Sequence, residues 1–225
     1  QEKRHEVNFT PAGVVSLDRT VIADESSGWL LKGQESINGH TYGYGLEYKQ
    51  YRYGYGSYAV GTGSALYPSQ KVNLLGGYLE DTWAIGDRWT GNVGLRYDKM
   101  EGRPDANPTT KSIDADSISP KVNFSFRNDK DTTTFLSVSR LWRSPSMAEF
   151  YWWSNNYSNA ARIGSFTDLN PEKGWGYEIG VEHKLTPAFS TKLTAYYQNI
   201  DDYINFTHQF PFSCYNIDNA RLWGF

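Results

Sequence analysis

The sequence predicts an all-β fold of the transmembrane, antiparallel, up-and-down β-barrel class. Three observations support this prediction: a composition that favours strands, long segments with a period of two, and connections that alternate between short and long. Of the 225 residues, 16% are aromatic and 21 are Gly, and the mean hydropathy is only −0.63. Aromatic residues and Thr favour strands, while Gly and Asn favour turns. No apolar run approaches the roughly 20 residues that a membrane-spanning helix needs.

Charge and cysteine content narrow the class further. The 22 basic and 25 acidic residues give a net charge of −3, so we expect no nucleic-acid partner and no highly charged disordered chain. The single cysteine, Cys214, excludes an internal disulfide framework. No signal peptide is visible in residues 1–20, and residues 219–225 look like an interrupted strand. We therefore expect an internal piece of a longer protein.

Alternating segments follow one another along the chain. In the segment that starts at Trp89, Val93, Leu95 and Tyr97 alternate with polar residues such as Arg96, which predicts one apolar and one polar face. Most of the predicted strands have about 10 to 14 residues, against about 5 to 6 in soluble domains. A tilted strand of about 9 to 11 residues crosses a bilayer. Residues 1–37 show the weakest pattern, and the predicted strands are 42–50, 71–85, 89–98, 118–127, 132–142, 176–185 and 189–198.

The connections between these segments alternate in length. Short polar turns are predicted at 85–88, 127–131 and 185–189, and long loops at about 100–117 and 142–171. In an antiparallel meander every second connection lies at the same end, so one rim carries turns and the other carries loops. Short periplasmic turns, long extracellular loops and aromatic girdles near the strand ends are typical of outer-membrane barrels. A soluble β-sandwich with Tyr-rich strands is the alternative that composition alone leaves open.

Three stretches resemble TonB-dependent receptors, the outer-membrane active transporters for scarce nutrients. In 76–98 the resemblance lies in a hairpin that ends in Gly-Leu-Arg-Tyr-Asp and contains Arg96. In 118–152 it lies in a strand that starts at Ser-Pro and a later Arg-Ser-Pro-Ser segment with Arg143 and Pro145. In 169–204 it lies in Leu-Asn-Pro-Glu, with Pro171 and Glu172, followed by Tyr-Glu-Ile-Gly with Glu178. The three stretches occur in the order that the family shows.

The resemblance implies a barrel of about 22 strands in the Gram-negative outer membrane, closed by an N-terminal plug domain that this chain lacks. Residues 1–225 would then form about eight to ten strands of that barrel, in contact with outer-membrane lipid. The implied activity is uptake of a ferric siderophore or a similar scarce nutrient, with energy from the TonB-ExbB-ExbD system through the plug. Because residues 143–170 contain no His, where the family's haem receptors usually carry a ligand His, a siderophore is favoured over haem.

No catalytic signature is present, and the four His share no ligand spacing. We therefore expect neither an enzyme nor a bound cofactor or metal. The predicted ligand-binding residues lie in the loop 142–171, where aromatic rings and a guanidinium could stack on and pair with a ligand: Trp152, Trp153, Tyr157 and Arg162. Anchoring of 151–153 at the membrane interface is an equal alternative. Ser146 and Glu149 have the spacing of a capping box, which predicts a helical turn at the loop base.

Two other functions remain open from the sequence. A passive porin would have the same kind of wall but no plug and no energised transport. A soluble carbohydrate-binding β protein would use the Trp and Tyr side chains as stacking platforms for sugars, and would fold without a membrane.

Overall fold

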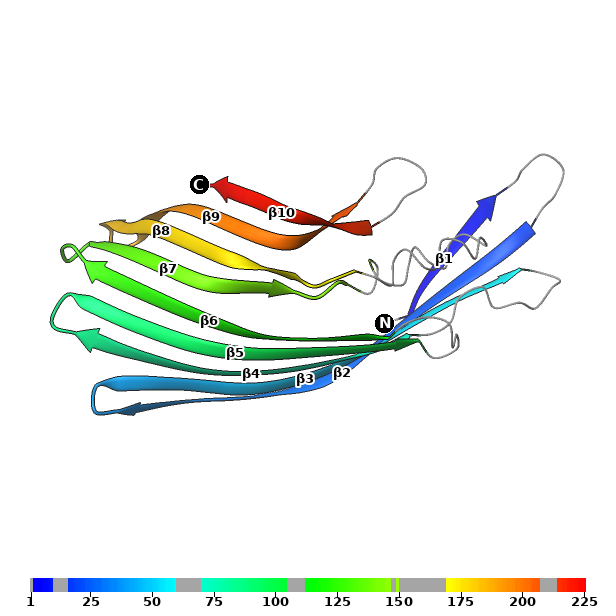
Figure 1. Ribbon diagram of the computed structural model, residues 1–225, viewed down its shortest axis with the longest axis horizontal. Coiled ribbons are helices and arrows are strands. Elements are labelled where there is room, and N and C mark those ends of the chain that lie inside the picture. The colour runs from blue at the N-terminus through cyan, green and yellow to red at the C-terminus, as the bar shows by residue number, and fades with distance from the viewer. Residues whose placement is uncertain are drawn as a thin grey trace.

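The computed structural model describes residues 2–9, 16–59, 70–104, 112–146, 149, 169–206 and 214–225. Over these residues the chain forms one ten-stranded sheet in which the spatial order of the strands equals their order in the sequence (Figure 1). The strands are β1 (Glu2–Phe9), β2 (Ser16–Ile37), β3 (His40–Ala59), β4 (Gln70–Ile85), β5 (Trp89–Pro104), β6 (Ile113–Arg127), β7 (Thr132–Arg143), β8 (Glu172–Thr186), β9 (Phe189–Phe206) and β10 (Cys214–Gly224).

Every pair of neighbouring strands is antiparallel, which confirms the all-β, up-and-down meander. The sheet is open, with β1 and β10 at its two edges. In the described part of the chain, no helix has the length and apolar character needed to cross a membrane. The strands are the elements that organise this molecule.

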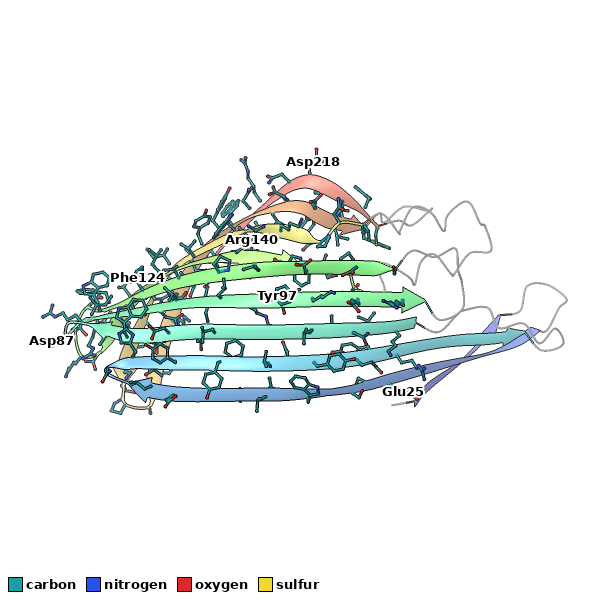
Figure 2. The ribbon with its side chains drawn as sticks, turned by 60° about the horizontal axis from the view of Figure 1, so that its bottom comes forward. Glu25, Asp87, Tyr97, Phe124, Arg140 and Asp218 are labelled. Carbon is teal, nitrogen blue, oxygen red and sulfur yellow. The ribbon has the colours of Figure 1, made fainter. Side chains whose placement is uncertain are left out.

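The two ends of the sheet carry connections of different length. Short turns at 38–39, 86–88, 128–131 and 187–188 lie at one end, which we call the short-turn end. The connections 10–15, 60–69, 105–112, 144–171 and 207–213 lie at the other, the long-connection end. Figure 2 shows Asp87 at the first end and Glu25 towards the second. The alternation predicted from the sequence is therefore present.

One predicted loop boundary is wrong. The sequence pattern placed a loop at about 100–117, but β5 continues to Pro104 and β6 begins at Ile113. The pairing continues because Met100 lies opposite Ala115 and Glu101 opposite Asp114. Beyond Tyr97 on β5, polar side chains take the alternate positions that apolar ones hold earlier in the strand. The hydropathy alternation therefore stops before the strand does.

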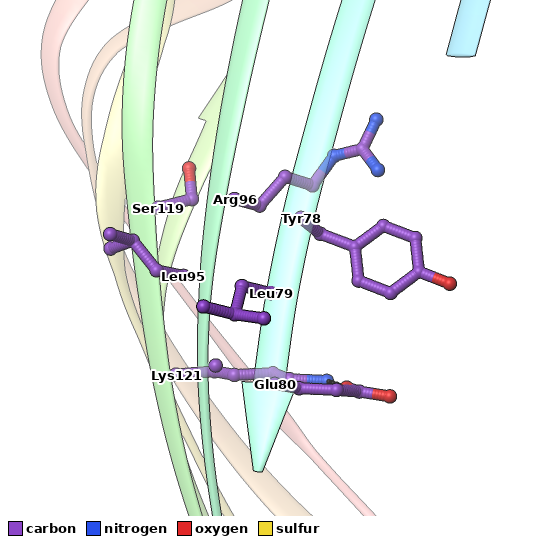
Figure 3. Close-up of a pocket in the computed structure, with 8 residues that line it drawn as sticks. Tyr78, Leu79, Glu80, Leu95, Arg96, Ser119 and Lys121 are labelled. Atoms are coloured by element: carbon purple, nitrogen blue, oxygen red, sulfur yellow. Dashed lines mark hydrogen bonds and ion pairs between the residues drawn. The ribbon is translucent and has the colours of Figure 1, made fainter. Parts of the chain in front are cut away.

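The sheet has an apolar and a polar face. Leu95 and Ile118 stand on the apolar face and are 54% and 57% exposed. Arg96 and Lys121 extend from the opposite, polar face (Figure 3). The apolar face carries this set of exposed residues: Leu31, Tyr44, Leu46, Leu79, Val93, Leu95, Tyr97, Ile118, Ile179, Leu193 and Trp223. These faces agree with the alternation read from the sequence.

The ladder between β6 and β7 is shorter than the others. It runs from Arg127 opposite Thr133 to Lys121 opposite Ser139, whereas β7 pairs with β8 as far as Arg143. Pro120, the next residue of β6, has no backbone N–H to donate. Beyond it the two strands separate towards the long-connection end (Figure 1).

A buried apolar cluster spans this separation. Its members come from β4, β5 and β6 on one side and from the segment before β8, β9 and β10 on the other: Val72, Met100, Ile113, Leu169, Ile204 and Cys214. Side-chain packing thus connects strands that the backbone ladder does not join at this height.

Candidate functional site

The polar face of β3, β4 and β5 carries a network of charges around Arg96. Its guanidinium donates to Asp98 from Nε at 2.8 Å and from Nη2 at 2.6 Å. The same Nη2 donates to Glu47, and Lys49 Nζ lies 3.2 Å from the second oxygen of Glu47. The charges of two carboxylates and two cations therefore balance on the polar face of the sheet. Sequence patterns do not reveal Glu47 as a partner of Arg96, because the two residues are 49 positions apart and meet only through the register of β3, β4 and β5.

A second ion pair lies closer to the short-turn end. Lys121 Nζ donates to Glu80 Oε2 at 2.6 Å, and Figure 3 shows both side chains on the same side of the sheet as Tyr78 and Arg96. Still closer to the short-turn end, Asn123 donates to Asn92 at 2.7 Å, and Asn92 donates to Thr82 at 2.7 Å. The polar face is thus a continuous hydrogen-bonding surface, suited to line an aqueous conduit.

Glycines on adjacent strands allow these long side chains to lie flat. A Cβ added at Gly94 would stand 2.5 Å from Lys121 Cε, and one at Gly76 would stand 2.7 Å from Arg96 Nη2. A Cβ at Gly43 would meet the Glu80 side chain at 2.9 Å. The charged groups therefore cover the wall rather than project away from it.

At the long-connection end, Arg143 holds the two ends of the connection 144–171 together. Its Nε and Nη2 donate to the two oxygens of Glu172 at 2.8 and 2.6 Å, and its Nη1 donates to Glu149 Oε2 at 2.8 Å. Glu172 is only 7% exposed, and its Oε1 also accepts the Ile204 N–H at 2.9 Å. We call Arg143, Glu149 and Glu172 the loop-base cluster.

Ser146 and Glu149 make the reciprocal contacts of a capping box. Ser146 N–H donates to Glu149 Oε2 at 2.7 Å, and Glu149 N–H donates to Ser146 Oγ at 3.2 Å, as predicted. Burial alone raises the pKa of Glu149, but hydrogen bonds from Arg143 and Ser146 outweigh it and hold the pKa below its ordinary value. The carboxylate is therefore charged under ordinary conditions and fixes the start of the connection.

The end of the same connection is tied to β10. Asn170 N–H donates to Asn216 Oδ1 at 2.8 Å, and Asn216 Nδ2 donates back to the Asn170 carbonyl at 3.0 Å. Asn216 Nδ2 also donates to the Asp202 carbonyl, where Asp202 has a positive φ of 56°. Both ends of 144–171 are thus fixed by side chains from β7 to β10.

The structure brings some predicted site residues together and leaves others apart. Arg143 and Glu172 bind each other, with Pro145 fully buried beside them and Pro171 directly before β8. Arg96 belongs to the separate network above. Glu178 is exposed on β8, opposite Ser137 and Tyr196.

The predicted ligand contacts Trp152, Trp153, Tyr157 and Arg162 lie outside the described residues. In the described ranges no group of three or more His, Cys, Asp or Glu is arranged to hold a metal ion.

Comparison with known proteins identifies the family. Residues 5–225 match the family described as TonB dependent receptor-like, beta-barrel. A hemin receptor from Yersinia pestis is 25% identical, over 84% of this chain and 30% of the relative. The chain thus spans about a third of the length of its relatives.

Solved structures of several transporters and receptors share the fold. The copper transporter OprC superposes with a TM-score of 0.76 at 18% identity, over 92% of this chain and 34% of that chain. The pyoverdine outer membrane receptor FpvA from Pseudomonas aeruginosa gives 0.67 at 16% identity, over 93% and 34%. Members of this family are transporters of the Gram-negative outer membrane and not enzymes, which agrees with both expectations from the sequence. The ten strands are part of such a barrel, and the chain belongs to the TonB-dependent receptors.

Proposed function

We propose that this chain forms part of the barrel and outer mouth of a receptor that takes up a ferric siderophore or a related metal chelate. The observation that carries the proposal is the loop-base cluster: Arg143 fixes a long connection at the end of the sheet that has no short turns. A capture loop needs such an anchor, because its ligand contacts must be held in place at low entropic cost.

In this proposal the two faces and the two ends have separate roles. The apolar face contacts outer-membrane lipid, and the polar face around Arg96 and Lys121 lines the conduit. The connection 144–171 captures the ligand through Trp152, Trp153, Tyr157 and Arg162, whose rings and guanidinium suit an aromatic, anionic chelate. Energy reaches the receptor from the TonB-ExbB-ExbD system through a plug domain encoded outside these residues.

The distribution of His supports a siderophore over haem. Residues 143–170 contain none. His40 and His183 both lie near the short-turn end, where His40 is bound to Asp81 and His183 contacts Thr132. Neither can therefore serve a ligand at the long-connection end.

Haem is the second candidate, because the similarity to a hemin receptor favours it. The His residues of this chain that remain for haem are His5 in β1 and His208 in the connection between β9 and β10. Replacing both by Ala separates the two candidates: uptake of haem through an imidazole of this chain is lost, whereas uptake of a siderophore is not.

The test is growth of an iron-starved deletion strain that carries the whole receptor gene. Hydroxamate, catecholate and mixed ferric siderophores and haem are supplied one at a time. We expect growth on at least one siderophore, and we expect this growth to be lost without TonB. Trp153→Ala together with Arg162→Ala should lower the affinity of the receptor for that siderophore about tenfold or more. Trp223→Ala, on the apolar face, is the matched control. Growth on no siderophore would overturn the assignment, and uptake that persists without TonB would favour a passive porin.

A further inference from the structure

The apolar face is not uniform: it has a hollow across β2 to β6. The hollow has a volume of about 660 Å³. Gly77 forms part of its floor, and a Cβ there would lie 3.0 Å from Leu46 Cδ2. Its walls are apolar or aromatic: Leu31, Tyr44, Leu46, Leu79, Leu95, Tyr97 and Ile118. Its size and lining suit a hydrocarbon chain.

The hollow continues towards the short-turn end into a second one with a polar group. This second hollow, of about 320 Å³, shares Leu79 and Leu95 with the first and adds Tyr42, Val93, Gly94, Glu80 and Asp81. The carboxylate of Glu80 is paired with Lys121 on the opposite face. The Asp81 carboxylate therefore lies at one end of an otherwise apolar trough. Leu79 and Leu95 are 59% and 54% exposed, so the trough is open to its surroundings along the face.

Asp81 is paired with His40 at this end. Nδ1 of His40 lies 2.8 Å from Asp81 Oδ2, and the two side chains are 40% and 23% exposed. The imidazole also stacks on Tyr42 and Trp83, with ring centroids 5.9 Å away in each case. The aromatic rings thus hold a His–Asp pair on the face that contacts lipid.

Asp81 is not fully satisfied by His40. Among the described residues, its Oδ1 is a buried acceptor with no hydrogen-bond partner. Because Oδ1 is shielded, a donor in the trough can reach this carboxylate only at Oδ2, which can accept a second hydrogen bond beside the His40 contact. Glu80, the next residue, makes the ion pair of the opposite face with Lys121, so the pairing on the conduit wall does not use Asp81.

The depth of the pair matches the headgroup region of a bilayer. Asp81 lies two residues along β4 from Trp83, and at the same end Trp89 packs against Phe126 in a tilted arrangement with ring centroids 4.6 Å apart. Aromatic girdles mark the membrane interfaces of such barrels, and short turns mark the periplasmic side. The trough therefore runs from the periplasmic headgroup level towards the middle of the membrane.

We propose that this trough binds one phospholipid of the periplasmic leaflet that carries a primary ammonium in its headgroup. An acyl chain fills the hollow over Gly77. The ammonium donates to the Asp81 carboxylate, and the neighbouring His40 faces the phosphate. A zwitterionic headgroup brings a cation to the Asp81 carboxylate, whereas an anionic headgroup brings a further negative charge and no cation. The site is independent of the transported ligand.

The experiment uses the whole receptor, extracted from membranes, stripped of lipid and examined by native mass spectrometry. The probes are phosphatidylethanolamine, phosphatidylcholine and phosphatidylglycerol with identical acyl chains. We expect one tightly retained phosphatidylethanolamine, preferred about tenfold over the other two, because choline has no N–H and glycerol has no positive charge. Equal retention of the three lipids overturns the proposal.

Two variants test the two halves of the trough. Asp81→Asn removes the charge at nearly constant shape and should abolish the headgroup preference, whereas Asp87→Asn, in the nearby turn, should leave it unchanged. Gly77→Leu fills the hollow and should lower retention of all three lipids, whereas Leu193→Trp, on the same face of β9, should not. A folded Asp81→Asn receptor that keeps its preference contradicts the headgroup contact. Unchanged retention in Gly77→Leu contradicts the acyl-chain site.

Discussion

The two ends of the sheet are held by different kinds of interaction. At the short-turn end two of the turns have ties within their own residues: Asn38 and Gly39 have φ values of 52° and 82°, and Asp129 accepts the N–H groups of Asp131 and Thr132 at 2.8 Å. At the long-connection end the ties come from distant strands, as between Arg143 and Glu172. Local sequence thus determines one rim, and tertiary contacts determine the other.

The largest expected effect comes from breaking the loop-base cluster. Arg143→Ala leaves Glu172 buried without its cation, so we expect the connection 144–171 to loosen at a cost of about 2 to 3 kcal/mol, below the range for fully buried pairs because Arg143 is half exposed. Limited proteolysis and hydrogen exchange of 144–171 in the whole receptor measure this. Arg140→Ala, on the same strand, is the control. Equal protection in both variants would contradict a tertiary tie at this rim.

A smaller effect is expected from a turn at the opposite rim. Gly39→Val places a β-branched side chain at positive φ, which costs about 1 to 2 kcal/mol. Urea unfolding of the whole receptor in lipid vesicles should show this loss, while protection of 144–171 stays unchanged. Ser36→Val, before the same turn, is the control. If Gly39→Val also loosens 144–171, the two rims are not independent.

The smallest effect is a pH dependence of the loop base. The folded pKa of Glu149 is lower than its ordinary value, so its contribution is present above the ordinary pKa and is lost as the pH falls through the folded one. Because the group is only partly buried, we expect less than about 1 kcal/mol. Hydrogen exchange of 144–171 between neutral and acidic pH measures it. Glu149→Gln should remove the dependence, and a dependence that survives in this variant would assign it to another group.

The sequence predicted the two faces of the sheet well, because apolar and polar residues alternate with a period of two wherever one face is apolar. It predicted β5, β6, β8 and β9 for that reason. It could not define β2, whose segment Asp24–Gly28 has low strand propensity and is a strand through its pairing with β3. The turn after β2 has a local signal that the predicted turns do not include, since Asn-Gly at 38–39 favours a tight hairpin.

The candidate site was less predictable than the fold. Motif resemblance selected Arg143 and Glu172, and the structure brings them together. Glu47, Glu80 and Lys121 were missed, because their pairing depends on which residues lie side by side across three strands. The signal would have been opposite charges on the same face of neighbouring strands, but these can be matched only once the register of the strands is known.

Because β6 and β7 separate, this part of the barrel wall should resist widening differently at its two ends. Between the short turns and Pro120, which we call the shaft, the β6–β7 ladder is complete. There a change in circumference must break backbone hydrogen bonds, so the shaft is stiff. Above Pro120 the strands are connected by the packing of Val72, Met100 and Ile113 against Leu169, Ile204 and Cys214. Packed side chains can slide without losing directional bonds. The mouth can therefore change its width while the shaft keeps its own.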